Sequence, residues 1–213
     1  MIKRKIVLVV DRSGSTQSIK GPMQSGIAEF LGIQAADQDA ETVVTLHDFD
    51  EEFRVVYVDQ PVADVPRYVL EPRGMTALRD AVGNAVQAEK EALKAMPEEE
   101  RPDEVVLVIA TDGYENSSRE YSWEQISEML AKLQREGRGK EKIHKRGWKV
   151  VYLGANQDAI AVGMRMGVPQ TSSVTYGAAG TESVYQSASN AILRSAGGKS
   201  VVFTEDERTD ALG

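Results

Sequence analysis

Cysteine is absent from this 213-residue chain, and histidine occurs only as His47 and His144. The chain therefore has no disulfide bonds and no thiolate metal sites, and a zinc site would depend mainly on carboxylates. We expect any bound metal to be a hard cation held by oxygen atoms. No apolar run approaches the roughly 20 residues of a membrane-spanning helix, and the first residues do not resemble a secretory signal. These absences predict a cytoplasmic protein that does not enter membranes.

Basic residues are also in deficit, with 25 lysines and arginines against 33 aspartates and glutamates, a net charge of −8. This balance argues against broad nucleic-acid binding. One segment, from Arg138 to Arg146, is strongly basic. It could bind an acidic partner or nucleic acid, but it has no interleaved aromatic residues, so a solvated loop is favoured. We predict that the chain does not bind nucleic acid.

Strand and helix patterns alternate along the chain, which predicts an α/β fold. Uninterrupted β-branched and apolar runs at 6–10 and 104–111 are typical of parallel strands buried on both faces. Two further strands, at 42–49 and 53–58, are separated by a short acidic gap and predict an antiparallel hairpin at one sheet edge. The remaining strands are expected at 148–153 and 172–176.

Helices are expected between these strands, at 23–37, at 77–96, after a capping serine at position 122, at 155–166 and at 181–195. Beyond Gly197 the pattern weakens into the acidic stretch TEDERTDALG. We therefore predict one domain over residues 1–197 and an acidic, flexible carboxy-terminal tail over 198–213.

Polar oxygen-bearing residues gather where the buried strands end. Asp11, Ser13 and Ser15 follow the first strand, Asp112 follows the strand at 104–111, and Thr76 lies in the loop GMTALRDA. In open α/β sheets, ligands bind beyond the carboxyl ends of the strands, where the strand order reverses. Hydroxyl and carboxylate oxygens are ligands for Mg²⁺ or Mn²⁺. Because hydroxyls are neutral, such a cation keeps positive charge that can attract a carboxylate from another molecule.

These three motifs, Asp-x-Ser-x-Ser, the loop threonine and Asp-Gly, occur together in order, and over nearly its whole length the sequence resembles a von Willebrand factor type A (vWA) domain with a metal-ion-dependent adhesion site (MIDAS). The resemblance implies a doubly wound, Rossmann-like, mostly parallel six-stranded sheet in the order 3-2-1-4-5-6, with one antiparallel edge strand and helices on both faces. It also implies that Ser13, Ser15 and Thr76 bind the metal directly, and that Asp11 and Asp112 bind it directly or through water. The ranges 152–168 and 183–194 are similar to uncharacterised bacterial and phage vWA proteins.

The function predicted from this resemblance is a non-enzymatic protein-binding module. Its Mg²⁺ or Mn²⁺ ion would be completed by an aspartate or glutamate of a partner protein, such as an AAA-type ATPase or an assembly component. One alternative is a structural or assembly protein, for example of a phage, whose metal stabilises the loops. A metal-assisted hydrolase or phosphotransferase with Asp11 as nucleophile is less favoured, because no general base is evident and Ser13 stands where a second aspartate is needed.

Single residues of these motifs also have structural interpretations. Ser13 and Ser15 alone would be typical of a helix cap, and it is their occurrence with Thr76 and Asp112 that favours a metal site. We expect Asp80 to be a structural hydrogen-bonding residue, Glu115 to be a solvated loop carboxylate and His47 to be an ordinary strand residue.

Overall fold

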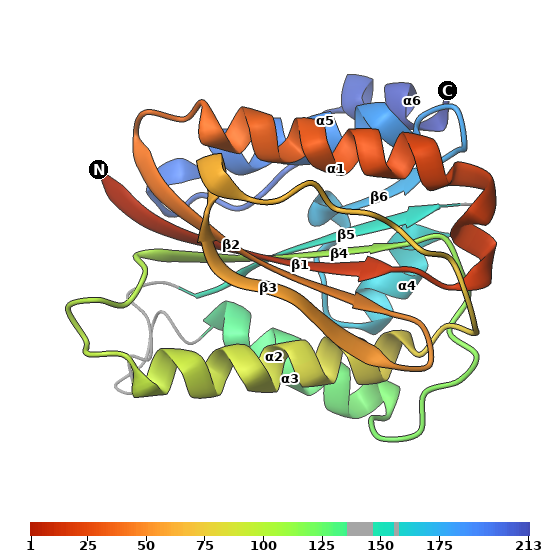
Figure 1. Ribbon diagram of the computed structural model, residues 1–213, viewed down its shortest axis with the longest axis horizontal. Helices are drawn as coiled ribbons and strands as arrows, with labels where there is room; N and C mark the ends of the chain where they lie inside the picture. The colour runs from red at the N-terminus through yellow and green to blue at the C-terminus, as the bar shows by residue number, and fades with distance from the viewer. Residues whose placement is uncertain (136–146, 156–157) are drawn as a thin grey trace.

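The computed structural model describes residues 1–135, 147–155 and 158–213. Within them lies a six-stranded sheet in the order β3-β2-β1-β4-β5-β6 (Figure 1). β2 and β3 are antiparallel, and the other neighbouring strands are parallel. The predicted strand order and the antiparallel edge are therefore confirmed. The basic segment from Arg138 to Arg146 lies outside the described residues.

The strands and helices match the predicted alternation, with one added helix at the end. The strands are β1 (Ile2–Asp11), β2 (Ala40–Phe49), β3 (Phe53–Pro61), β4 (Glu104–Thr111), β5 (Lys149–Ala155) and β6 (Ser173–Tyr176). The helices are α1 (Lys20–Ala35), α2 (Leu78–Ala95), α3 (Trp123–Arg135), α4 (Ala159–Arg165), α5 (Thr181–Arg194) and α6 (Glu205–Leu212). A short 3-10 helix, Gly14–Ile19, precedes α1.

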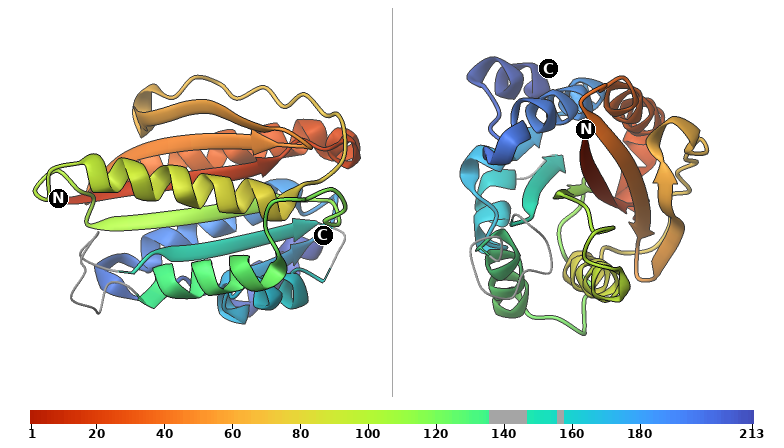
Figure 2. Two further views of the ribbon diagram at one scale, coloured as in Figure 1. Left: turned by 90° about the horizontal axis from the view of Figure 1, so that it is seen from below. Right: turned by 90° about the vertical axis from the view of Figure 1, so that its left-hand side faces the viewer.

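The sheet separates two apolar cores, each covered by helices. Along β1, Ile6, Leu8 and Val10 pack on the side of α1 and α5, whereas Val7 and Val9 pack on the side of α2 and α3. This division follows from the alternation of side chains along a strand. Figures 1 and 2 show the resulting three layers, with α1 and α5 on one face and α2 and α3 on the other. Helix cover on both faces explains why the runs 6–10 of β1 and 105–110 of β4 are apolar without interruption. No described helix is long and apolar enough to cross a membrane.

The predicted boundary at residue 197 differs from the structure, because the last 16 residues pack onto the domain. Val201 and Phe203 are buried in the core, as is Ala211 of α6. Thr204 and Glu207 form a reciprocal capping box at the start of α6. This signal is present in the sequence as Thr-x-x-Glu, but it lies inside the acidic run that suggested a tail. Residues 198–213 therefore form part of the same folded unit as the sheet.

A buried charged cluster lies between the sheet and α2. Lys5 Nζ is 2.5 Å from Glu89 Oε2 and 2.6 Å from Asp59 Oδ1, and Lys5 and Glu89 are almost fully buried. His47, expected to be an ordinary strand residue, is also buried here. Its ring stacks on Phe53 and its Nε2 is 3.7 Å from Glu89 Oε1. Burial raises the pKa of the Glu89 carboxyl, but the neighbouring His47 and Lys5 together lower this pKa by more than burial raises it. The pKa of Glu89 therefore lies below its ordinary value.

We predict that Glu89→Ala lowers the free energy of unfolding by about 3–5 kcal/mol, because it leaves the Lys5 ammonium buried without its carboxylate. Denaturant unfolding monitored by circular dichroism measures this effect. Glu91→Ala is the matched control, because it removes the exposed ion pair with Lys94 from the same helix and should cost at most about 1 kcal/mol.

The buried pair of Lys5 and Glu89 should make stability depend on pH in the acidic range. Because the pKa of Glu89 is lower in the folded than in the unfolded protein, its contribution is present above the unfolded value of about 4.3 and is lost as the pH falls through the folded value. Between pH 6 and pH 3, Glu89→Ala should therefore lose less stability than the wild type. Parallel pH profiles for the two proteins would contradict this assignment.

Candidate metal site

Three loops meet at the carboxyl edge of the sheet, at the point where the strand order reverses. The first loop, residues 11–15, leaves β1, and the third loop, residues 112–118, leaves β4, which lies next to β1. The second loop, residues 73–76, leads into α2. From β1 the chain proceeds through α1 to β2 on one side, while β4 lies on the other side. This is the position where open α/β sheets form ligand crevices.

Asp11 anchors the first loop at the end of β1. It is fully buried, and its Oδ1 accepts a hydrogen bond from the Ser13 backbone N–H at 2.7 Å. Its Oδ2 accepts a hydrogen bond from Thr111 Oγ1 at 2.5 Å, which ties β1 to β4. Both carboxylate oxygens are thus oriented by the two strand ends. Burial raises the pKa of Asp11, and the hydrogen bonds from Thr111 and Ser13 oppose this shift.

The hydroxyls of Ser13, Ser15 and Thr76 converge in front of Gly113. Ser13 Oγ and Ser15 Oγ share a hydrogen bond of 2.9 Å, and Ser15 Oγ donates to Asp112 Oδ1 at 2.8 Å. A β-carbon added to Gly113 would lie 2.8 Å from Thr76 Oγ1, 3.1 Å from Ser15 Oγ and 3.5 Å from Ser13 Oγ. The three hydroxyl oxygens therefore surround one point. All five residues singled out in the sequence meet at this edge of the sheet.

The charges at this point suit a divalent cation. Burial raises the pKa of Asp112 to about 6, and the nearby charge of Asp11 contributes to the shift. Within the described residues, Asp11 and Asp112 contact hydroxyl and backbone N–H groups and form no ion pair with a basic side chain. Among the described residues, no group of three or more histidine or acidic side chains is arranged so that it could hold a metal ion. Any cation bound here would depend on the hydroxyls for most of its protein ligands and would offset the carboxylate charge.

The first loop is fixed by a network of ion pairs that the sequence did not reveal. Arg12, at the variable position of Asp-x-Ser-x-Ser, is buried, with its guanidinium 3.0 Å from Asp50 Oδ2 and 3.4 Å from Asp48 Oδ1. Asp48 also pairs with Arg54, and Asp50 also pairs with Arg73. The five side chains alternate in charge from the β2–β3 hairpin to the second loop.

Backbone hydrogen bonds complete this attachment. The N–H of Arg12 donates to the carbonyl of Phe49, and the N–H of Arg73 donates to the carbonyl of Arg12, both at 2.8 Å. The N–H of Gly14 donates to the carbonyl of Gly74 at 3.2 Å. The first and second loops are therefore joined directly, and both are joined to the end of β2.

Side chains of the third loop hold the second loop in place. Asn116 Oδ1 accepts from the Thr76 backbone N–H at 2.9 Å, and the Asn116 N–H donates to the Thr76 carbonyl at 3.0 Å. Asn116 was not identified from the sequence, although its position close after Asp112 would have been a signal.

Glu115 does not match its prediction as a solvated carboxylate. It accepts hydrogen bonds from the backbone N–H groups of Arg79, Ser117 and Ser118, because it lies against the first turn of α2. Asp80 has the expected structural role, since it accepts from three consecutive backbone N–H groups at residues 119–121.

No family model and no curated protein matches this sequence. Solved structures nevertheless resemble it. Proximal thread matrix protein 1 from the mussel byssus is 10% identical with a TM-score of 0.61, and the match covers 88% of this chain and 47% of that one. A von Willebrand factor type A protein from Catenulispora acidiphila is 12% identical with a TM-score of 0.55, covering 88% and 42%. The ArnB paralog VWA2 from Sulfolobus acidocaldarius is 14% identical with a TM-score of 0.54, covering 87% and 44%.

The chain therefore has the fold of vWA domains, as the sequence motifs predicted. It spans less than half the length of each of these three structures. At such low identities the likeness concerns the fold. The chemistry of the site depends on the residues of this chain.

We predict that Gly113→Ala weakens divalent-cation binding at least tenfold while the protein stays folded. The added methyl group would lie 2.8 Å from Thr76 Oγ1 and would occupy the point that the hydroxyls surround. Titration with Mn²⁺, followed by electron paramagnetic resonance of the free ion, measures the affinity. Gly32→Ala in α1 is the matched control, because its added methyl group meets no atom within 4 Å. Equal affinities in both variants would contradict the placement of the cation.

Proposed function

We propose that this chain is a protein-binding module that holds a divalent cation, Mg²⁺ or Mn²⁺, through Asp11, Ser13, Ser15, Thr76 and Asp112. The cation then recognises an aspartate or glutamate side chain of a partner protein. The observation that carries this proposal is the convergence of three hydroxyls on one point beside two carboxylates. The vWA fold supports it, because this point lies beyond the carboxyl ends of the parallel neighbours β1 and β4, where open α/β sheets bind ligands.

The ligand set favours recognition of a carboxylate. Mg²⁺ prefers six oxygen ligands and usually retains several waters. Three of the five proposed residues are neutral hydroxyl donors, so a bound cation keeps part of its charge. Ser15 is exposed and Asp112 is partly exposed, so the site is open to solvent on one side. An acidic side chain of a partner could replace water there and offset the remaining charge.

Catalysis by Asp11 is disfavoured by the way the residue is held. A nucleophilic carboxylate needs an oxygen accessible to substrate, whereas Asp11 is fully buried and both its oxygens accept hydrogen bonds. His47, the histidine within the described residues, is buried beside Glu89 in the cluster under α2 and not at the site. These contacts support binding over a hydrolase or phosphotransferase activity.

The alternative in which the metal merely stabilises the loops is also less favoured. The first and second loops are held by the Arg12–Asp50 ion pair and the hydrogen bond from Gly14 to Gly74. Asn116 holds Thr76 from the other side. Because these contacts involve no cation, the loops have their own means of support, and the cation is left for recognition.

The metal site is tested by isothermal titration calorimetry. We expect the wild type to bind one Mg²⁺ or Mn²⁺ ion per chain, and Thr76→Ala and Asp112→Asn to bind it at least tenfold more weakly. The first substitution removes a direct ligand and the second a negative charge. Ser25→Ala, on the exposed face of α1, should bind like the wild type. If the two site variants bind the metal as the wild type does, the site assignment is wrong.

The recognition step is tested by affinity capture from a lysate of the source organism, using the purified chain as bait in Mg²⁺ or in chelator. We expect an AAA-type ATPase or an assembly component to be retained in Mg²⁺ and released by chelator. Thr76→Ala bait should fail to retain this partner. Wild-type bait should likewise fail to retain a partner in which the coordinating aspartate or glutamate is changed to its amide. Equal retention in Mg²⁺ and in chelator would argue against coordination through the metal.

A further inference from the structure

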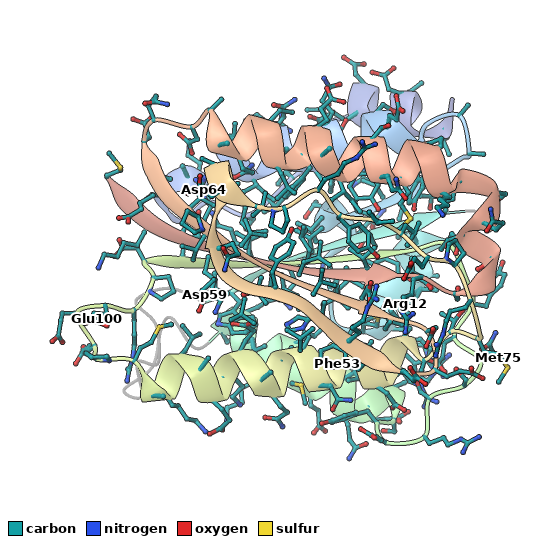
Figure 3. The ribbon with its side chains drawn as sticks, in the orientation of Figure 1. Arg12, Phe53, Asp59, Asp64, Met75 and Glu100 are labelled. Atoms are coloured by element: carbon teal, nitrogen blue, oxygen red, sulfur yellow. The ribbon has the colours of Figure 1, made fainter. Side chains whose placement is uncertain are left out.

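Two large apolar side chains stand exposed beside the proposed metal position. Met75 immediately precedes Thr76 and is 47% exposed, and Tyr114 immediately follows Gly113 and is 68% exposed. Thr76 and Gly113 face each other across the point that the hydroxyls surround. Figure 3 shows Met75 pointing outward at the end of the molecule that also holds Arg12, opposite the end that holds Glu100. The two exposed side chains therefore lie on different loops, each next in the chain to a residue that borders this point.

Met75 is exposed on backbone that is held on both sides. The carbonyl of Gly74, before it, accepts from Gly14, and the N–H of Thr76, after it, donates to Asn116 Oδ1. Gly74 itself has a φ of 66°, the left-handed conformation in which glycine is favoured. The position of Met75 is thus imposed by its neighbours and is not a consequence of a loosely attached loop.

Tyr114 is held in the same way. Its preceding residue, Gly113, packs against the three hydroxyls, and its following residue, Glu115, accepts a hydrogen bond from the Ser118 N–H at 2.8 Å. Two exposed apolar side chains on fixed backbone lose little backbone freedom when a partner covers them. Methionine and tyrosine are both enriched in protein interfaces, and tyrosine is frequent among the residues that dominate binding energy.

We infer that Met75, Tyr114 and the proposed cation together form a docking surface for a protein segment that carries an acidic side chain next to an apolar one. This inference rests on the proposed function and specifies its partner. The cation, ligated largely by neutral hydroxyls, selects the carboxylate by charge. Met75 and Tyr114 carry no charge and bury the adjacent apolar side chain, so that a peptide with an isolated acidic residue binds more weakly.

The test is selection of a displayed library of random 12-residue peptides on the immobilised full chain in Mg²⁺, with elution by chelator. We expect enriched peptides to contain aspartate or glutamate with an aliphatic or aromatic residue within three positions. For one synthesised peptide, Met75→Ser and Tyr114→Ser should each weaken binding about tenfold, which corresponds to about 1.4 kcal/mol. Tyr114→Phe should retain binding, because the apolar ring carries the contact.

Matched controls separate this surface from general hydrophobicity and from the metal site. Met164→Ser removes a 59% exposed methionine from α4, and Val58→Ser removes a 48% exposed valine from β3; both should bind the peptide like the wild type. All these variants should also bind Mn²⁺ with wild-type affinity, because none removes a proposed ligand.

Each other outcome has a defined meaning. Chelator-sensitive peptides that bind Met75→Ser and Tyr114→Ser as tightly as the wild type would overturn this inference and leave the proposed function standing. Failure to enrich any chelator-sensitive peptide, while Mn²⁺ still binds, would also overturn it. So would enrichment of peptides that bind only where two copies of this chain associate. Absence of Mn²⁺ binding by the wild type would overturn the proposed function itself.

Discussion

The pairing of the buried Arg12 guanidinium with Asp48 and Asp50 is the interaction on which the arrangement of the site depends. Removing these charges from water is costly, and buried ion pairs often add little net stability. What this network provides is position, because it connects the end of β2 with the first and second loops. If the first loop shifted, Ser13 and Ser15 would no longer face Thr76. The network thus fixes the first and second loops, with their hydroxyls, relative to the sheet. The proposed binding of a cation requires these hydroxyls at fixed distances from one another.

Much of the fold could be predicted from the sequence because its strongest signals are local. The apolar runs of β1 and β4 can be satisfied only by burial on both faces, and the acidic gap between β2 and β3 allows only a short connection. The motif residues could also be predicted to lie together, since the carboxyl ends of neighbouring parallel strands share one edge of the sheet. The strand ends account for Asp11, Ser13, Ser15 and Asp112, whereas Thr76, in the loop before α2, was placed with them by the resemblance to the vWA motif.

The features that could not be predicted are those that depend on partners distant in the chain. Arg12 would ordinarily be expected at the surface, and nothing local indicates that two aspartates of another strand neutralise it. Glu115 resembles a solvated loop residue until α2 supplies its hydrogen-bond donors. Helix α6 was missed for a different reason. Its capping box is a local signal, but its burial depends on close packing against Gly180, which is distant in the chain. A β-carbon at Gly180 would lie 1.9 Å from the Ala211 carbonyl oxygen.

The chain of hydrogen bonds from Ser13 through Ser15 to Asp112 has a consequence for how the proposed cation would enter and leave the site. In the geometry described, the hydroxyls of both serines already have partners. A cation that arrives would replace these bonds, and a cation that departs would allow them to form again. Neither event would leave the hydroxyl of Ser13 or Ser15 without a partner, and a buried polar group without a partner is costly. Occupancy would then follow the free cation concentration around the protein reversibly, and attachment to an acidic partner would be adjustable by the same variable.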